Sequence, residues 1–180
     1  RRQRQMCIRD SGNGVITTDD RIIYSQRPDV TFGFNNTFNY KGFDLSVFLY
    51  ARLGQWIAYD YNTTYRINAL ENGGNVDYWT PENPTNAFPR PNKSKSYTQV
   101  TYYSTLKYED GSFFKIRDIT LGYTFKPELL KHLNLSRLRV YATAKNFFTF
   151  SKIDNYDPEQ GGSISFPMTK QLVFGLNVEF

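Results

Sequence analysis

The chain has 180 residues and a formal net charge of +5. Much of that charge lies in Arg1, Arg2, Arg4 and Arg9, and no basic stripe follows them, so the composition argues against a nucleic-acid-binding protein. No apolar run reaches the roughly 18 residues that a membrane-spanning helix needs. The single Cys7 cannot form an internal disulfide.

Aromatic residues make up 17% of the chain, with 14 Tyr and 15 Phe, which favours β-structure over helices. The mean hydropathy of −0.57 does not exclude a membrane protein, because a barrel strand is apolar on one side only. The first residues contain no apolar signal-peptide core, which leaves either a cytosolic protein or a piece of a longer chain.

Residues 1–11 show neither periodicity nor turn chemistry, and we expect a non-native or disordered tail there. Residues 12–20 resemble the second half of a calcium-binding loop in which Gly14 makes the turn. The first and third ligand positions would then be Arg9 and Ser11, and an arginine cannot bind a cation. We therefore predict no cofactor for this chain and leave a calcium site to the full-length protein.

Residues 30–40 and 43–53 each alternate between apolar and polar side chains. Successive side chains of a strand point to opposite faces, so each stretch predicts a strand with one apolar face. The dipeptide Lys41-Gly42 between them is a tight-turn signal. The sequence therefore predicts a long hairpin with one continuous apolar face.

Residues 112–125 and 137–149 are predicted as two further strands. The alternation changes phase before Asp118, which indicates a β-bulge at that point. Between the two strands, residues 126–136 predict one or two helical turns with Pro127 near the start.

Residues 171–180 complete the pattern with a strand of the length, about 9–11 residues, that crosses a membrane. Its polar face is interrupted only by Val173. The same alternation occurs in the last strand of a soluble sandwich, so this strand alone leaves both folds open. Its apolar face is formed by Leu172, Phe174, Leu176, Val178 and Phe180.

In chain order the connections alternate between short and long: 41–42 is short, 54–111 long, 126–136 short and 150–169 long. Outer-membrane barrels have short periplasmic turns and long extracellular loops, so we expect the loops 54–111 and 150–169 outside the cell. Five strands cannot close a barrel, whose smallest form has about eight. The fold class is therefore predicted as all-β, with residues 12–180 forming the C-terminal antiparallel strands of a larger transmembrane barrel. The residues expected to line its lumen are Asp44, Tyr50, Arg52, Arg139, Tyr141 and Lys145.

The long loop 54–111 supplies the candidate ligand site. Flat aromatic rings can pack against the C–H faces of sugars while Asn and Asp meet the hydroxyl groups. The alternative is that these rings pack the loop itself or contact a partner protein. The candidates are Trp56, Tyr59, Tyr61, Tyr78 and Trp79.

No catalytic constellation is present in the sequence. With one histidine, His132, and one cysteine, Cys7, the chain offers little for a zinc site or a Ser-His-Asp triad. No carboxylates are paired for glycosidase chemistry. We predict that the protein is not an enzyme and holds no metal.

Several segments, in this order and spacing, resemble the SusC/RagA family of TonB-dependent outer-membrane transporters of Bacteroidetes. The resemblance covers about residues 12–180. The segments that carry it are Gly12–Arg21, Pro28–Phe34, Lys41–Ser46, Trp79–Pro84, Phe114–Tyr123, Leu138–Tyr141 with Lys145-Asn146, and the terminal strand.

The resemblance implies a protein of the Gram-negative outer membrane that imports oligosaccharides or peptides. It implies a SusD-like lipoprotein as partner, and energy from TonB–ExbB–ExbD acting through a plug and a TonB box that this chain lacks. Lumen-facing Arg and Lys would pair with acids on the plug. The last strand, with Gly175, Val178 and Phe180, would be the signal read by the barrel assembly machinery. A non-transport barrel and a soluble carbohydrate-binding β-sandwich remain as alternatives.

Overall fold

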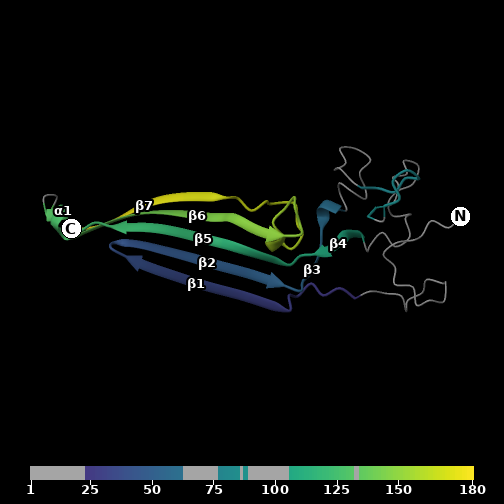
Figure 1. The fold of residues 1–180 in the computed structure, drawn as a ribbon, viewed down its shortest axis with the longest axis horizontal. Coiled ribbons are helices and arrows are strands. Elements are labelled where there is room, and N and C mark those ends of the chain that lie inside the picture. The colour runs from purple at the N-terminus through teal and green to yellow at the C-terminus, as the bar shows by residue number, and fades with distance from the viewer. Residues whose placement is uncertain (1–22, 63–76, 86, 89–105, 132–133) are drawn as a thin grey trace.

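A computed structural model describes residues 23–62, 77–85, 87–88, 106–131 and 134–180. The main element is one antiparallel five-stranded sheet, with strand order β1-β2-β5-β6-β7 (Figure 1). The predicted strands are confirmed, with shifts of one or two residues at some ends. Their bounds are β1 Val30–Tyr40, β2 Phe43–Leu53, β5 Phe113–Thr124, β6 Arg137–Ser151 and β7 Gln171–Glu179.

The turn between β1 and β2 is formed by Lys41 and Gly42, whose φ angles are 48° and 89°. Two consecutive positive φ angles are typical of the tight hairpin turn that matches the right-handed twist of the strands. A Cβ on Gly42 would also lie 2.8 Å from the carbonyl oxygen of Thr124. The turn fixes an uninterrupted register in which Val30 lies opposite Leu53 and Tyr40 opposite Phe43.

The predicted bulge lies at Arg117. On β2, Leu49 pairs with Ile116 and Phe48 with Asp118, so Arg117 has no partner in the ladder. The extra residue restores the phase, so that apolar side chains stay on one face on both sides of the bulge. Sequence alternation alone was sufficient to find it.

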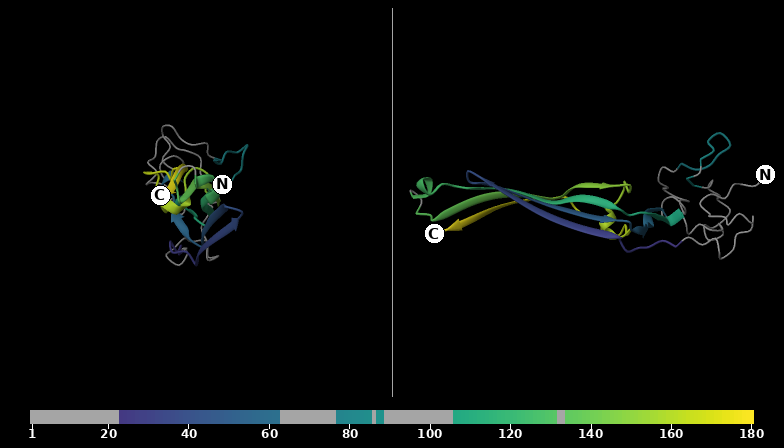
Figure 2. Two further views of the ribbon diagram at one scale, coloured as in Figure 1. Left: turned by 90° about the vertical axis from the view of Figure 1, so that its left-hand side faces the viewer. Right: turned by 60° about the horizontal axis from the view of Figure 1, so that its bottom comes forward.

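The sheet is long, narrow and twisted (Figure 2). The turn of β1–β2 and the short helix α1, Pro127–Leu130, lie at one end, and the described parts of the long connections lie at the other (Figure 1). The predicted alternation of short and long connections therefore sorts them to opposite ends. The sequence did not predict the two short strands inside the first long loop, β3 Trp56–Ala58 and β4 Tyr108–Asp110, which pair with each other.

One face of the sheet carries large apolar side chains that no second layer of described residues covers. Asn36 is the polar exception on this face, where it lies opposite Val47. An uncovered apolar surface of this extent marks a contact with lipid or another apolar partner. Its most exposed members include Phe32, Phe34, Phe38, Phe43, Leu121, Phe148, Phe150, Leu172, Phe174, Leu176 and Phe180.

Some predictions fall outside the described residues. These are the tail at residues 1–11, the calcium-loop resemblance at 12–20, His132, and parts of the loop 54–111. Among the described helices, none combines the length and apolar character needed to cross a membrane.

Candidate functional site

The polar face of the sheet is organised by charge pairs between strands. Arg139 on β6 donates two hydrogen bonds to Asp44 on β2, with Nε 2.8 Å from Oδ1. The pair spans β5 at Gly122, where a Cβ would lie 2.5 Å from atoms of both side chains. A glycine at position 122 therefore allows a cation and a carboxylate two strands apart to meet.

The other predicted lumen residues lie on this same face. Arg52 donates from Nε to the Tyr50 hydroxyl at 2.8 Å, and its guanidinium lies 6.0 Å from the Phe113 ring centroid. Lys145 lies 3.8 Å from Asp118. We expected the basic residues to find acids on a plug; Arg139 and Lys145 instead pair with carboxylates of this chain.

Tyr141 covers Gly175 on the neighbouring strand, since the two residues are directly opposite. A Cβ on Gly175 would overlap the Tyr141 ring. An aromatic ring packed over a cross-strand glycine is a known device for stabilising a glycine in a sheet. Gly175 therefore has a packing role, and its predicted part in barrel assembly stays a prediction.

We expect Gly175→Val to destabilise the intact receptor by about 1–3 kcal/mol, because the added side chain must displace the Tyr141 ring. Urea unfolding of protein reconstituted in liposomes would measure this. The double variant Gly175→Val/Tyr141→Ala should regain much of the loss. If the double variant unfolds in urea as easily as Gly175→Val alone, the loss of stability does not come from displacing the Tyr141 ring.

The connection between β6 and β7 folds back over the polar face. Its anchor is Lys115, whose side chain is 0% exposed and whose Nζ lies 2.6 Å from Asp157 and 2.8 Å from Glu159. Arg117, the bulge residue, lies 3.1 Å from the same Glu159. We name this set of two cations and two carboxylates the loop anchor.

The loop anchor is built by local sequence signals that the sequence analysis missed. Asp157 caps the short 3₁₀ helix Pro158–Gln160 by accepting a hydrogen bond from the Glu159 amide at 3.0 Å. This acidic cap followed by proline is a helix-start signal. Lys115 also falls on the polar phase of β5. Neither signal shows that the two would meet, because they are 42 residues apart.

A small core forms at the loop end of the sheet from segments distant in sequence. Ile57, Tyr59 and Ile153 are buried together, and Tyr61 and Tyr156 pack against them. Gly162, with a φ angle of +94°, lies so close to Ala58 that an added Cβ would overlap the Ala58 carbonyl oxygen. The Gly162 carbonyl oxygen accepts a hydrogen bond from the Asp60 backbone amide at 3.0 Å. The two long connections are therefore joined into one packed unit.

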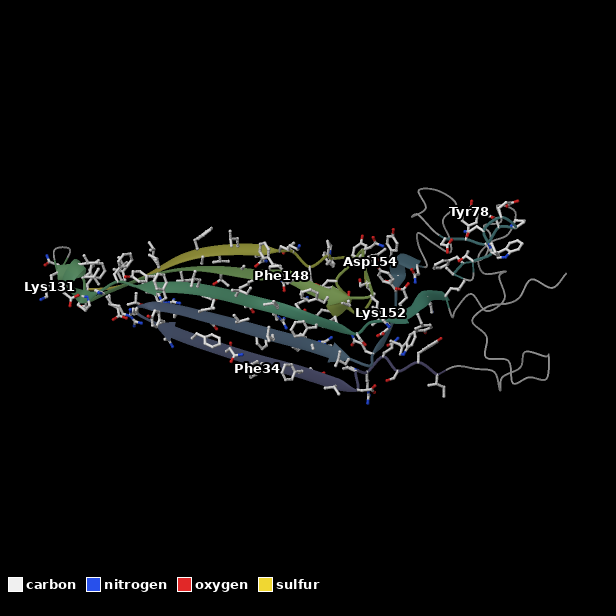
Figure 3. The ribbon with its side chains drawn as sticks, viewed as in Figure 1. Phe34, Tyr78, Lys131, Phe148, Lys152 and Asp154 are labelled. Atoms are coloured by element: carbon white, nitrogen blue, oxygen red, sulfur yellow. The ribbon has the colours of Figure 1, made fainter. Side chains whose placement is uncertain are left out.

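The structure separates the predicted ligand-binding aromatics. Tyr59 is only 2% exposed, and Tyr61 lies 5.7 Å from it between ring centroids, so these two serve the small core. Trp56 is 37% exposed and lies 4.6 Å from Tyr24. Tyr78 and Trp79 belong to a different turn, with Tyr78 at the far end of the view in Figure 3.

That turn is closed by Asp77. Its carboxylate accepts hydrogen bonds from the Asn83 amide at 2.8 Å and from the Thr85 hydroxyl. The Thr85 and Asn83 hydrogen bonds hold the pKa of Asp77 below its usual range. Because the folded-state pKa is lowered, the stabilisation is present above the unfolded pKa of about 3.9 and is lost as pH falls through the folded value.

We therefore expect hydrogen exchange in residues 77–85 to be constant above about pH 4 after correction for intrinsic rates, and to rise below it. Asp77→Ala should show the faster exchange at neutral pH as well, because both hydrogen bonds are lost. Glu82→Ala, in the same turn but outside this network, is the control. Unchanged exchange in Asp77→Ala would show that the carboxylate does not close the turn.

A cavity of about 240 Å³ lies between the end of β6 and the loop 152–170. Asn146, Thr149 and Ser151 form its β6 side. The remaining walls come from the loop, including Asp157 of the loop anchor. The loop residues that line it are Ile153, Asp154, Asn155, Tyr156, Asp157, Pro158, Pro167, Met168 and Lys170.

Comparison with known proteins gives consistent matches. The chain is 31% identical to TonB-dependent receptor P3 of Formosa agariphila, over 94% of this chain and 18% of the relative. It is 30% identical to TonB-dependent receptor SusC of Bacteroides thetaiotaomicron, over 97% of this chain and 17% of the relative. The RagAB peptide importer in its closed-closed state superposes with a TM-score of 0.72 at 26% identity, over 92% of this chain and 19% of that one. Over most of its length the chain is therefore similar to one segment of SusC/RagA-type TonB-dependent receptors. No family model matches it.

The chain spans less than a fifth of the length of the SusC and P3 receptors. The relatives and the structural neighbour are receptors and importers and not enzymes, in agreement with the prediction from the sequence. The predicted fold class, strands of a larger barrel, is also confirmed.

Proposed function

We propose that this chain forms part of the wall of a transporter in the Gram-negative outer membrane that imports large solutes without changing them. The observation that carries the proposal is the contrast between the two faces of one sheet. Exposed Phe and Leu side chains cover one face. Charge pairs such as Asp44–Arg139 occupy the other. Lipid outside and water inside a barrel match these two faces.

The partners belong to the proposal as well. The relatives support a TonB-dependent cycle powered by TonB–ExbB–ExbD, and a SusD-like lipoprotein over the outer mouth. Barrel assembly machinery would insert the chain and read its last strand, including Val178 and Phe180. The solute would be an oligosaccharide or a peptide; the RagAB neighbour is a peptide importer. A calcium site at residues 12–20 remains a proposal for the full-length protein.

The alternatives differ in what they require. A soluble carbohydrate-binding sandwich needs a second sheet over the apolar face, and the described residues supply none. A barrel serving adhesion or structure would share the two faces but would need no TonB box. No observation on this chain favours adhesion over transport.

The proposal predicts that growth on at least one polymeric nutrient depends on the TonB box of the intact receptor. Strains with the wild-type gene, a TonB-box deletion and a full deletion would be compared on a panel of glycans and on a casein digest as sole carbon source. The two deletions should share one growth defect. If only the full deletion shows a defect, and it concerns adhesion or envelope integrity, the chain belongs to a structural barrel.

A further inference from the structure

The cavity beside β6 is bordered by polar side chains that hydrogen-bond to none of the described residues. Asp154 and Asn155 are exposed at its rim, and neither makes a hydrogen bond or ion pair with any described residue. Lys170, also at the rim, contacts the Phe147 ring at 6.0 Å and forms no ion pair within the described part of the chain. Figure 3 shows Asp154 at the loop end of the sheet. Within the described part of the chain, a carboxylate and an amide therefore border the cavity without a hydrogen-bonding partner, beside an ammonium group that contacts only an aromatic ring.

The walls of the cavity are held in place before any ligand binds. The loop anchor fixes Asp157 through Lys115. Ser151 donates to the carbonyl oxygen of Ile153 at 2.8 Å, and Asn146 donates to that of Thr169 at 3.2 Å. A preformed site spends little of its binding energy on ordering loops and side chains. The free polar groups thus stand on a fixed frame.

The cavity also contains one supported aromatic ring. Tyr156 lines it, and Tyr61 backs that ring at 6.1 Å between centroids. An aromatic face beside hydrogen-bonding side chains fits the apolar C–H face and the hydroxyl groups of a sugar ring. The Asp154 carboxylate and the Lys170 ammonium carry opposite charges, so the rim does not favour a ligand of one charge sign over a neutral one.

The size limits the ligand. The volume of about 240 Å³ is below the roughly 300–1,000 Å³ of cavities that enclose a whole drug-sized ligand. A cavity of this size on the polar face would hold one unit of a longer molecule that continues past it. Thr149 and Lys115 are opposite each other in the register, which places the cavity on that face.

From these features we propose that the cavity binds one sugar residue of a neutral oligosaccharide. Asp154 and Asn155 would hydrogen-bond its hydroxyl groups, and Tyr156 would offer its ring face. The inference rests on the proposed transport function and narrows its substrate class from oligosaccharide or peptide to oligosaccharide. It also gives Tyr61 a supporting part in binding, although Tyr61 serves the small core.

The test uses the intact receptor with its lipoprotein partner, purified in detergent. The probes are maltohexaose, cellohexaose, laminarihexaose and mannohexaose, with a tryptic digest of casein in parallel, and binding is measured by isothermal titration. We expect at least one hexasaccharide to bind, and Asp154→Ala/Asn155→Ala to weaken it about tenfold or more, because hydrogen bonds to two side chains are lost. The control Gln160→Ala/Ser165→Ala changes two exposed residues of the same loop that do not line the cavity and should bind as the wild type does.

Binding that is unchanged in the Asp154→Ala/Asn155→Ala variant would overturn the proposal, as would binding of none of the four sugars. Peptide binding that the same variant weakens would reassign the cavity to peptides. TonB-box-dependent growth, measured separately, tells these results apart from failure of the transport function. If growth depends on the TonB box but the cavity variant binds sugars as the wild type does, the transport proposal stands and only the proposed sugar site is refuted.

Discussion

Replacing Lys115 with methionine should release the loop 152–170 from the polar face. Removing one partner of a buried ion pair costs about 3–5 kcal/mol, because the remaining charges stay desolvated. Here Asp157 and Glu159, with side chains 12% and 10% exposed, would lose their shared cation. The loop lies at the end of the sheet, so the protein can avoid that cost by moving both carboxylates into water. We therefore expect fast hydrogen exchange across residues 153–162, with the strands still protected.

The control for this variant is Lys152→Met. Lys152 pairs with Asp110 at 2.9 Å, but its side chain is 80% exposed. An exposed pair contributes about 0–1 kcal/mol, so exchange in the loop should stay close to wild type. The triple variant Lys115→Met/Asp157→Asn/Glu159→Gln removes the buried cation and both carboxylates and leaves only Arg117, whose side chain is 38% exposed and can reach water, so it should recover much of the protection. Normal exchange in Lys115→Met would mean that the small core around Tyr59 holds the loop without the anchor.

Val47→Arg should be the most damaging single change on the apolar face. Val47 lies near the middle of β2, between Asn36 and Ile119 on the flanking strands. A lipid-facing arginine at the bilayer midplane costs about 2–4 kcal/mol, and the cost falls to about 0–1 near the interfaces. Leu53→Arg, at the end of the same strand, should therefore be much milder. Urea unfolding of the intact receptor in liposomes gives the free energy of unfolding of each variant.

Ser46→Arg tests the opposite face at the same depth. Ser46 donates to Asn35 at 3.3 Å on the polar side of the sheet, where an added arginine can reach water. We expect a loss below about 1 kcal/mol, consistent with a surface substitution. A cost at Ser46 equal to that at Val47 would show that the polar face does not border water. A cost at Leu53 equal to that at Val47 would favour burial between two sheets over a membrane.

The sequence by itself determined the strands, their faces and the ends to which the connections run. Alternation of side chains is a local property, so residues 30–40 and 43–53 reveal their faces without knowledge of any partner strand. The same holds for the turn at Lys41-Gly42 and for the bulge, since each changes the phase or direction of the chain where it stands. The prediction of the six lumen-facing residues, Asp44, Tyr50, Arg52, Arg139, Tyr141 and Lys145, followed from that alternation alone.

Only the tertiary structure decided which side chains meet. Asp44 and Arg139 are 95 residues apart, and their contact depends on the register of β2, β5 and β6 together. Tyr59 looked like a ligand-binding ring because composition cannot tell a buried ring from an exposed one. Its burial follows from two long connections packing on each other. Local patterns fix the geometry of each strand, whereas the loop anchor and the cavity depend on where distant loops close.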